Sequence, residues 1–488
     1  MNAADVLIVG GGSAGCVLAA RLSEDPRRTV LLLEAGPDHV SEHQTPPEIL
    51  DGHSLALSHD WGYSGDSGRA IRVPRPRIVG GSSATNATMA LRGQPSDYDG
   101  WGLVGWSFRD ILPCFRKLES DHDFADEWHG ADGPLPIRRY RLEELAPAQA
   151  AFLAAARTTH ACAQDLNAPD ALGAGTIPMN TEGGIRKSAA LTYLAAARAR
   201  VNLTIRPQAE VDHVVLEGRR AVGVRLAAGG EMIHAARVVL SAGAFGSPAI
   251  LWRSGVGPAE PLRQLGITLR QELPGVGAGL ADHPLFTLHY AARRPTPSHR
   301  VPLFQTMLVL SSAQIFPTSV VPVGILKVST GGLLSLNTAA RKPRSTGSVT
   351  LVSKDPTVAP RIHFDHLACA EDLEVMLEAV LEARRLAAAA PLSELVLREV
   401  FPGDPVQTRA QLAAVLRRHV TTYHHACGTC RMGRGADAVV NASGEVHGLD
   451  ALSVIDASIL PTIPSANIHL TVLMVAEHCA VALAGTSH

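Results

Sequence analysis

Apolar residues open the chain in a strand, helix, strand order. Residues 5–10 form a short apolar run that ends at glycines, residues 14–24 carry apolar side chains at helical spacing, and residues 29–33 are apolar again. A fully apolar strand that ends at glycines is typical of a central strand in a doubly wound parallel sheet. The beginning of the chain therefore predicts an α/β domain.

Further periodic segments extend this domain and suggest a second sheet. Glycine-bounded, β-branched runs predict strands over residues 203–205, 211–216, 221–226 and 238–240. Helices are predicted over residues 147–163, 371–389 and 470–484, the last of them after a buried strand over residues 452–456. A strand over residues 348–352, with the uncharged stretch before it, suggests the second sheet. Residues 45–100 are rich in Gly, Pro, Ser and Asp and predict long loops of the kind that cover ligands.

Residues 301–326 contain no Asp, Glu, Lys or Arg, and the segment is long enough for a membrane-spanning helix. Pro302, Pro317 and Pro322 interrupt it, and two glutamines add polar groups within it. We therefore expect buried strands and loops here and no transmembrane segment, with peripheral membrane contact as the remaining alternative.

Composition excludes some classes of function. Lys and Arg number 44 against 46 Asp and Glu, and no basic run is dense enough to follow a phosphate backbone, so we expect no nucleic-acid partner. A hydrophobic content of 46% and a charged content of 18% fit a globular chain. No cationic leader precedes the first apolar run, so a cytoplasmic location is expected. Seven cysteines, an odd number, predict reduced thiols.

The loop after the first strand fits the pattern G-x-G-x-x-G, with the residues Gly10, Gly12, Ser13, Ala14 and Gly15. In this pattern the first glycine makes the turn, the second admits a pyrophosphate, and the third lets the helix pack on the strand. Glu34 and the adjacent Ala35 end the next strand, where a carboxylate can accept hydrogen bonds from ribose hydroxyls. This context predicts a dinucleotide site, but these residues alone do not separate FAD from NAD.

Gly80 and Gly81 offer a second place for a flat ligand. Adjacent glycines permit positive φ and close backbone approach, so residues 82–86 can run along a flat ring with their amides available. Such pairs are also common in ordinary turns, and the residues alone leave both interpretations open.

Several stretches resemble one known family. The segment 77–86, RIVGGSSATN, resembles the first signature of the glucose-methanol-choline (GMC) flavin oxidoreductases, which include choline dehydrogenase-like and alcohol oxidase-like members. The segment 243–257 is similar to the second signature at every specified position, and the segment 425–433, HACGTCRMG, resembles the family motif H-P-x-G-T-C-x-M-G. With further likeness at residues 106–113, 273–284 and 456–467, the resemblance spans nearly the whole chain.

The resemblance implies the fold and the cofactor. It implies an α/β protein (α+β overall), in which a Rossmann-like FAD-binding domain (residues 1–145, 190–285 and 436–488) is combined with a discontinuous substrate-binding domain (residues 146–189 and 286–435) built on an antiparallel sheet flanked by helices. Some members attach FAD through a histidine where this chain has Thr85, so we predict non-covalent FAD. Besides the residues of the first glycine-rich loop, Glu34 and Ala35, the expected cofactor contacts are Arg77, Gly80, Gly81, Ser82, Asn86, Ala87, Val211, Ala242, Gly243, Asp456, Ala457, Asn467 and Ile468.

The same resemblance selects the catalytic candidates. His425 occupies the position of the family histidine beside the flavin, and a neutral imidazole suits the removal of an alcohol's hydroxyl proton. Asn467 matches a second polar position whose amide could donate to the substrate oxygen, although Asn467 could also simply cap the following helix. His469 is expected to face the substrate with them.

Other interpretations of these segments stay open on the residues alone. His424, Cys427 and Cys430 could be zinc ligands or a redox dithiol. Such crowding of ligands in one short segment is sterically awkward, and the resemblance explains the residues as backbone packing near the flavin, so we expect no metal. The adjacent Asp282 and His283 match a family pair and are expected to form a structural turn.

We therefore predict FAD-dependent oxidation of a primary alcohol to an aldehyde, with hydride transfer to flavin N5 and reoxidation by oxygen or another electron acceptor. The alternatives are an FAD-containing lyase, like the hydroxynitrile lyases of the family, and a non-catalytic flavoprotein. An aromatic content of 4% gives little sign of a cage for choline, and an aromatic alcohol is equally compatible. The sequence identifies neither the alcohol nor the oligomeric state.

Overall fold

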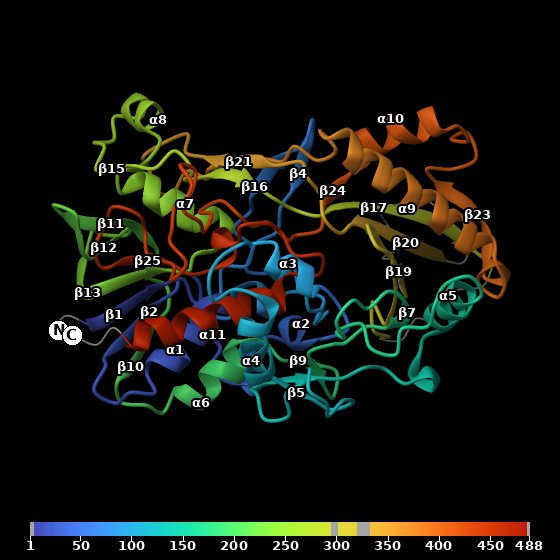
Figure 1. The fold of residues 1–488 in the computed structure, drawn as a ribbon, viewed down its shortest axis with the longest axis horizontal. Coiled ribbons are helices and arrows are strands. Elements are labelled where there is room, and N and C mark those ends of the chain that lie inside the picture. The colour runs from blue at the N-terminus through green and yellow to red at the C-terminus, as the bar shows by residue number, and fades with distance from the viewer. Residues whose placement is uncertain (1–3, 294–300, 320–331, 486–488) are drawn as a thin grey trace.

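Three large sheets organise the computed structural model, which describes residues 4–293, 301–319 and 332–485 (Figure 1). Two of them have seven strands and one has five. In Figure 1 the first seven-stranded sheet lies on the left and the second on the right.

The first sheet contains the predicted parallel strands. Its strands, in spatial order, are β10 (Leu203–Arg206), β2 (Val30–Leu33), β1 (Ala4–Val9), β13 (Met232–Leu240), β12 (Arg220–Leu226) and β11 (Val211–Glu217), with β25 (Leu452–Val454) beside β13. Strands β10, β2, β1, β13 and β25 run parallel, whereas the beginning of β13 pairs antiparallel with β12. Helix α1 (Ser13–Leu22) packs on β1 and β2, α11 (His469–Gly485) packs on α1, and α7 (Gly243–Arg253) packs on β11. The predicted Rossmann-like sheet is thus confirmed.

The second sheet is wholly antiparallel. Its strands are β23 (Val396–Phe401), β17 (Pro284–Ala292), β20 (Leu333–Ala340), β19 (Ala313–Thr318), β18 (Thr306–Val309) and β7 (Gly173–Thr176), with β24 (Thr421–Thr422) beside β17. Helices α5 (Pro147–Arg157) and α9 (Ala370–Ala388) pack on the sheet, and α10 (Arg409–His419) packs on α9. Because side chains alternate along a strand, Leu308 and Ile315 join the core under the helices while Met307 and Phe316 join a separate cluster. The predicted antiparallel sheet flanked by helices is confirmed.

Two details of the sequence prediction are wrong. The strand expected at residues 348–352 is β21 (Gly347–Thr350), which lies in the five-stranded sheet, whereas the uncharged stretch before it supplies β18 and β19 of the second sheet. Asp372 accepts from the backbone amides of Arg344 and Ser345 and so fixes the turn between the two sheets. The helix expected over residues 147–163 ends at Arg157, because the backbone of residues 161–163 bonds to Ala174 of β7 instead.

Shorter elements complete the chain. The five-stranded sheet comprises β16 (Ala278–Leu280), β21, β22 (Arg361–His363), β3 (Ser64–Asp66) and β4 (Ala70–Arg72). The remaining helices are α2 (Pro47–Leu50), α3 (Pro95–Asp99), α4 (Phe108–Leu118), α6 (Ala195–Ala197) and α8 (Ala259–Gln264). The remaining strand pairs are β5 (Glu119–Asp121) with β6 (Leu135–Ile137), β8 (Thr181–Glu182) with β9 (Ile185–Arg186), and β14 (Val256–Gly257) with β15 (Gln271–Glu272).

The long uncharged segment forms strands as far as it is described. Buried strands β18 and β19 occupy residues 306–318, and residues 320–326 lie outside the described part of the chain. Among the described residues, no helix has both the length and the apolar character needed to cross a membrane. The division of the chain into two discontinuous domains stays a prediction.

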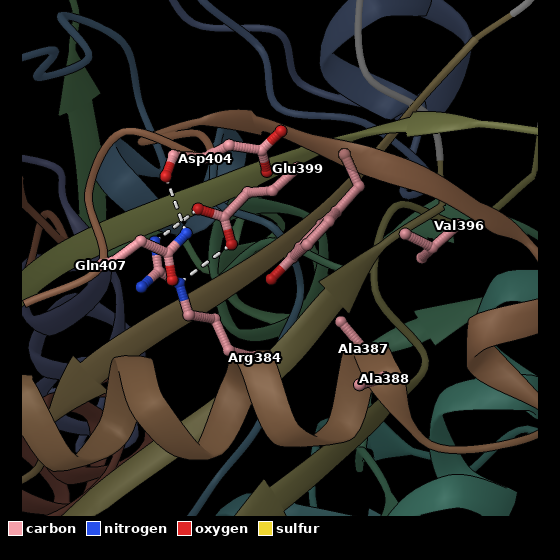
Figure 2. A pocket seen from close by; sticks show the side chains of 8 residues that line it. Arg384, Ala387, Ala388, Val396, Glu399, Asp404 and Gln407 are labelled. Carbon is pink, nitrogen blue, oxygen red and sulfur yellow. Dashed lines mark hydrogen bonds and ion pairs between the residues drawn. The ribbon is translucent and has the colours of Figure 1, made fainter.

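A surface pocket of about 260 Å³ lies beside α9 and β23 (Figure 2). It is lined by Tyr290, Arg384, Ala387, Ala388, Val396, Glu399, Asp404 and Gln407. The Arg384 guanidinium donates to both carboxylate oxygens of Glu399, at 3.0 and 2.6 Å. None of the residues predicted for the functional site lines this pocket.

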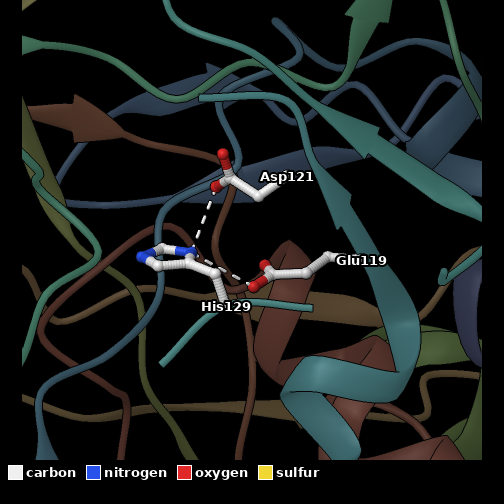
Figure 3. Close-up of side chains that lie close together, drawn as sticks. All are labelled: Glu119, Asp121 and His129. Atoms are coloured by element: carbon white, nitrogen blue, oxygen red, sulfur yellow. Dashed lines mark ion pairs between the residues drawn. The ribbon is translucent and has the colours of Figure 1, made fainter. Parts of the chain in front are cut away.

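A buried imidazole lies among three carboxylates near β5. Figure 3 shows the His129 imidazole paired with the carboxylates of Asp121 and Glu119. Nδ1 of His129 is 3.1 Å from Oδ2 of Asp121 and 3.3 Å from Oε1 of Glu119, and Nε2 is 3.1 Å from Oδ2 of Asp165. Burial by itself lowers the pKa of His129, but hydrogen bonds to Asp121, Asp165 and Glu119 outweigh burial and raise it to about 11. The imidazole is therefore charged at neutral pH.

Two arginines balance the remaining charge of this cluster. Arg92 donates to Glu119 at 2.7 Å, and Arg139 contacts Asp121 at 2.9 Å and Asp165 at 2.6 Å. The three buried carboxylates thus meet two guanidinium groups and one imidazolium, and Asp123 adds a further contact to Arg139 at 3.5 Å. Through Arg92, this ion cluster anchors the segment that follows the loop at Gly80.

We expect the His129 contribution to stability to decline as pH rises. The folded pKa is raised above the ordinary value of 6.5, so the stabilisation is complete below about pH 6.5 and is lost as pH rises toward about 11. Replacement His129→Gln should cost about 3 kcal/mol near pH 6 and less near pH 10, measured as the difference in thermal unfolding from the wild type. A difference that grows with pH would contradict this charge assignment.

Candidate active site

Loops that carry predicted cofactor residues leave the carboxyl ends of neighbouring parallel strands. Gly10 follows β1, Glu34 follows β2, Gly243 follows β13, and Asp456 follows β25. In open α/β sheets this edge is where ligands bind, because loops diverge there and leave a crevice. The fold therefore gathers residues that are far apart in the sequence along one edge.

The first glycine-rich loop requires glycine at the predicted positions. Gly10 has a φ of 101°, and a Cβ on it would lie 2.5 Å from the carbonyl oxygen of Ser241. A Cβ on Gly15 would lie 1.9 Å from the carbonyl oxygen of Gly10. At Gly12 the nearest atoms to such a Cβ are 4.0 Å away, so this position is open to an approaching ligand.

The second glycine loop packs directly on the first. The Gly80 amide donates to the carbonyl of Gly11 at 2.7 Å, and a Cβ on Gly81 would lie 2.6 Å from the Cα of Gly12. Gly80 has a φ of 103°, as the glycine pair predicted. The two loops form one continuous backbone surface.

Some of the expected cofactor residues are accessible and the others are buried. This division fits a ligand that lies along the surface. The accessible ones are Gly10, Gly12, Ser13, Ala35, Arg77, Ser82, Asn86, Ala87, Ala242, Gly243, Ala457 and Ile468. The buried ones are Ala14, Gly15, Glu34, Gly80, Gly81, Val211, Asp456 and Asn467. Beyond Glu34 a pocket of about 430 Å³ continues, lined by Ala35, Gly36, Pro37, His59, Asp60, Arg77 and Gln208. An elongated nucleotide therefore fits the residues present.

Two buried carboxylates fix these loops. Glu34 accepts from the amides of Gly11 and Gly36, each at 2.8 Å, and burial raises its pKa to about 7 against the effect of these bonds. Asp456 accepts from the Gly243 amide at 2.8 Å and from Ser247 Oγ at 2.6 Å. Asp456 thus ties two strand ends together, and Glu34 keeps lone pairs that can accept ribose hydroxyls.

His425 forms a hydrogen-bonded pair with a second buried imidazole. Its Nδ1 lies 2.8 Å from Nδ1 of His283. Nε2 of His283 lies 2.9 Å from the carbonyl of Arg341 and 3.0 Å from that of Pro464. Carbonyl oxygens only accept, so Nε2 of His283 carries its proton and Nδ1 accepts. The bonding pattern therefore assigns the other proton to Nδ1 of His425 and leaves its Nε2 unprotonated.

The electrostatic surroundings keep both imidazoles neutral. Burial, together with His283 and weaker positive neighbours, holds the pKa of His425 well below its ordinary value, while Asp282 opposes the shift. Burial likewise lowers the pKa of His283. Oδ1 of Asp282 accepts from the backbone amide of His425 at 2.8 Å and so orients that residue. A neutral imidazole with one free lone pair is the form that a general base requires.

Asn467 and Tyr423 converge on the sulfur of Met89. The Asn467 Nδ2 and the Tyr423 hydroxyl each lie 3.6 Å from Met89 Sδ, and the Tyr423 ring centroid is 4.3 Å from that of His425. Within the described chain, the buried Oδ1 of Asn467 and Nε2 of His469 have no hydrogen-bond partner. Because a thioether is a weak acceptor, these polar groups keep their capacity to bind a ligand.

The structure also shows residues that the sequence did not reveal. From the sequence, His283 was expected in a structural turn. No motif pointed to Tyr423, Met89 or Arg341. The pair Asp282 and His283 was the only available signal, because the partners of His283 come from three separate segments.

The cysteines near His425 are buried in a segment that backbone hydrogen bonds hold in place. Gly428 and Cys430 donate backbone hydrogen bonds to Ala457 and Ser458, at 3.1 and 2.8 Å. Burial raises the thiol pKa values of Cys427 and Cys430, so both stay protonated at neutral pH. The interpretation of these cysteines as backbone packing near the flavin stays a prediction.

Comparisons with known proteins agree with this geometry. The family models for GMC oxidoreductase match residues 4–285 and 343–476. An uncharacterized GMC-type oxidoreductase of Rhodococcus erythropolis is 37% identical over 500 residues, with 99% of this chain and 98% of the relative covered. An oxygen-dependent choline dehydrogenase of Klebsiella pneumoniae is 34% identical over 531 residues, with 99% and 96% covered.

A solved structure extends the likeness to three dimensions. The crystal structure of pyridoxine 4-oxidase from Mesorbium loti superposes with a TM-score of 0.94 at 34% identity, over 99% of this chain and 100% of that chain. FAD is the cofactor, and the protein is an alcohol oxidoreductase. The chain therefore belongs to the GMC oxidoreductase family, as the sequence motifs predicted.

Proposed function

We propose that this enzyme oxidises a primary alcohol to an aldehyde, with His425 as general base and Asn467 as the donor that holds the substrate oxygen. The observation that carries this proposal is the pairing of His425 with His283, which leaves Nε2 of His425 free to accept a proton. FAD, when bound, supplies the two-electron acceptor that takes the hydride at its N5. Non-covalent attachment and the cytoplasmic location stay predictions, and either oxygen or another electron acceptor would reoxidise the flavin.

His425, Asn467 and His469 would each contact the alcohol. Nε2 of His425 accepts the hydroxyl proton, and the Asn467 amide donates to the same oxygen as negative charge develops on it. His469, which also has an unpartnered buried nitrogen, lies at the beginning of α11, two residues beyond Asn467. The Asn467 amide would exchange its contact with the Met89 thioether, a weak acceptor, for the substrate oxygen, whereas Nε2 of His469 has no partner within the described chain.

His283 would hold the proton in place after transfer. Once protonated, His425 donates from Nδ1 to Nδ1 of His283, and the nearby Asp282 carboxylate favours the positive charge. The other nitrogen of His283 faces two backbone carbonyls, which cannot take a proton onward. The proton therefore remains on His425 until the product leaves.

Removing the base should abolish turnover while leaving the cofactor bound. We expect His425→Ala to lower kcat/KM about 10²- to 10⁴-fold, because general base catalysis contributes about that much. Anaerobic bleaching of the flavin by a primary alcohol measures the loss, and the flavin absorbance of the purified variant reports cofactor content. A fully active variant would refute the role of His425.

The acid limb of the kcat/KM profile should lie at lower pH than the ordinary imidazole pKa. The protonated imidazole is inactive, and the pKa of His425 is held well below 6.5, so kcat/KM should stay level through neutral pH and fall only below the ordinary imidazole range. The profile is measured on the holoenzyme at constant ionic strength. An acid limb above about pH 7 is the contrary result.

Changing His283 should alter catalysis according to hydrogen-bonding capacity. His283→Gln can still accept from His425 and donate to a carbonyl, whereas His283→Leu leaves Nδ1 of His425 without its acceptor. We expect the leucine variant to lose about 10- to 100-fold in kcat/KM and to shift the acid limb, and the glutamine variant to recover most of the activity.

His289→Gln is the matched control for this pair. The His289 imidazole bonds to Ser335, outside the pair, so this variant should keep the wild-type pH profile. Equal losses in the glutamine and leucine variants would mean that His283 acts by packing alone.

A further inference from the structure

Apolar side chains form much of the surroundings of Tyr423 and Asn467, together with the buried amide of Gln314. Tyr423 packs against a buried cluster that includes Met89, Ile177, Met307, Phe316 and Ala466. The members from β18 and β19 lie on the opposite strand positions from those that face the helices. A substrate held by His425 and Asn467 would therefore rest its body against hydrocarbon, aromatic and thioether groups.

The carboxylates that act on the site are already engaged. Asp282 holds the amide of His425 and lies 3.4 Å from Nε2 of His366. Asp97 accepts from Ser465 Oγ at 2.6 Å and pairs with Lys342 Nζ at 2.9 Å. Asp97 is thus neutralised by Lys342, whereas the charge of Asp282 acts on His425.

The third nearby carboxylate is engaged as well. Asp60 accepts from the Arg75 amide at 2.9 Å and from the Arg72 guanidinium at 3.0 Å. The internal segments 294–300 and 320–331, which lie outside the described structure, contain no Asp or Glu in their sequence. Of these three carboxylates, Asp60 and Asp97 are therefore paired with an arginine and a lysine.

Positive charge already lies close to the site. Arg341 is 5% exposed and donates to the carbonyl oxygens of Ser465 and Leu310, at 2.8 and 2.7 Å, rather than to a carboxylate. Arg75 is a further cation whose charge lowers the pKa values of His424 and His425, after the larger effect of burial. At His469 burial alone lowers the pKa, to about 4, and no carboxylate opposes it.

The aromatic rings do not form an open cage. Tyr423 is stacked on Phe316, with centroids 5.4 Å apart and planes at 15°, and its ring also contacts His425. Phe316 in turn meets Phe304 edge to face at 5.2 Å. These rings contact one another, whereas a cage would present several faces to one cation.

We infer that the site takes an uncharged primary alcohol with an apolar body and discriminates against a quaternary ammonium alcohol. This inference rests on the proposed function, because it concerns the alcohol held by His425 and Asn467. Burying a cation without an anion or an aromatic cage is costly, whereas an uncharged body of the same shape gains from leaving water.

The direct test compares choline with 3,3-dimethylbutan-1-ol, in which carbon replaces the charged nitrogen. Anaerobic flavin reduction by the holoenzyme gives kcat/KM for each, and the inference predicts at least a tenfold preference for the neutral alcohol, which is about 1.4 kcal/mol. Equal rates, or a preference for choline, would overturn the inference while leaving the proposed function intact. Failure of every alcohol to reduce the flavin would overturn the proposed function and the inference with it.

A charge substitution tests the electrostatic origin of the preference. Gln314 is buried on β19, within hydrogen-bond reach of the Tyr423 hydroxyl, and Gln314→Glu adds a carboxylate there with little change in shape. The variant should move the choline to dimethylbutanol ratio at least tenfold toward choline.

Gln407→Glu adds the same charge in the pocket beside α9 and should leave that ratio unchanged. An unchanged ratio in a folded Gln314→Glu enzyme would overturn the electrostatic explanation. If that variant fails to fold, the comparison of the two alcohols on the wild-type enzyme still decides the inference.

Discussion

The proposed chemistry depends on one buried hydrogen bond between two imidazoles. Because Nε2 of His283 faces two carbonyl oxygens, the proton positions of both rings are determined, and His425 presents a bare nitrogen. Arg341 contributes twice. Its carbonyl accepts from His283, and its guanidinium donates to the carbonyl of Ser465, two residues before Asn467. One buried arginine thereby helps to place both polar groups that would meet the alcohol.

The two seven-stranded sheets supply complementary parts of the site. The parallel sheet provides a carboxyl edge where glycine loops and the carboxylates of Glu34 and Asp456 form the cofactor surface. Under the proposed function, the antiparallel sheet would provide an apolar face for the substrate, since alternate side chains of β18 and β19 point away from the helices. Asn467 precedes α11, which packs on α1 behind the first glycine loop, so the two parts are joined through one helix.

The sequence predicted those features whose cause is local. The loop from Gly10 to Gly15 was recognisable because its glycine spacing lies between an apolar strand and a helix, and Glu34 follows at the end of the next strand. Family resemblance supplied FAD and the choice of His425 among 21 histidines. Features that depend on residues distant in the sequence could not be predicted. Nothing near His283 in the sequence indicates that residues 341, 425 and 464 surround it, and the end of α5 depends on a strand that follows it in the chain.

Nitrogen-15 NMR of histidine-labelled protein tests this account most directly, because it reads the protonation of each ring nitrogen. The spectrum of a His425→Gln variant identifies the His425 signals by difference. Near neutral pH the structure predicts a neutral His425 ring protonated at Nδ1 and bare at Nε2. A His425 ring protonated at Nε2, or charged at that pH, would contradict the assignment of His425 as a base prepared by His283.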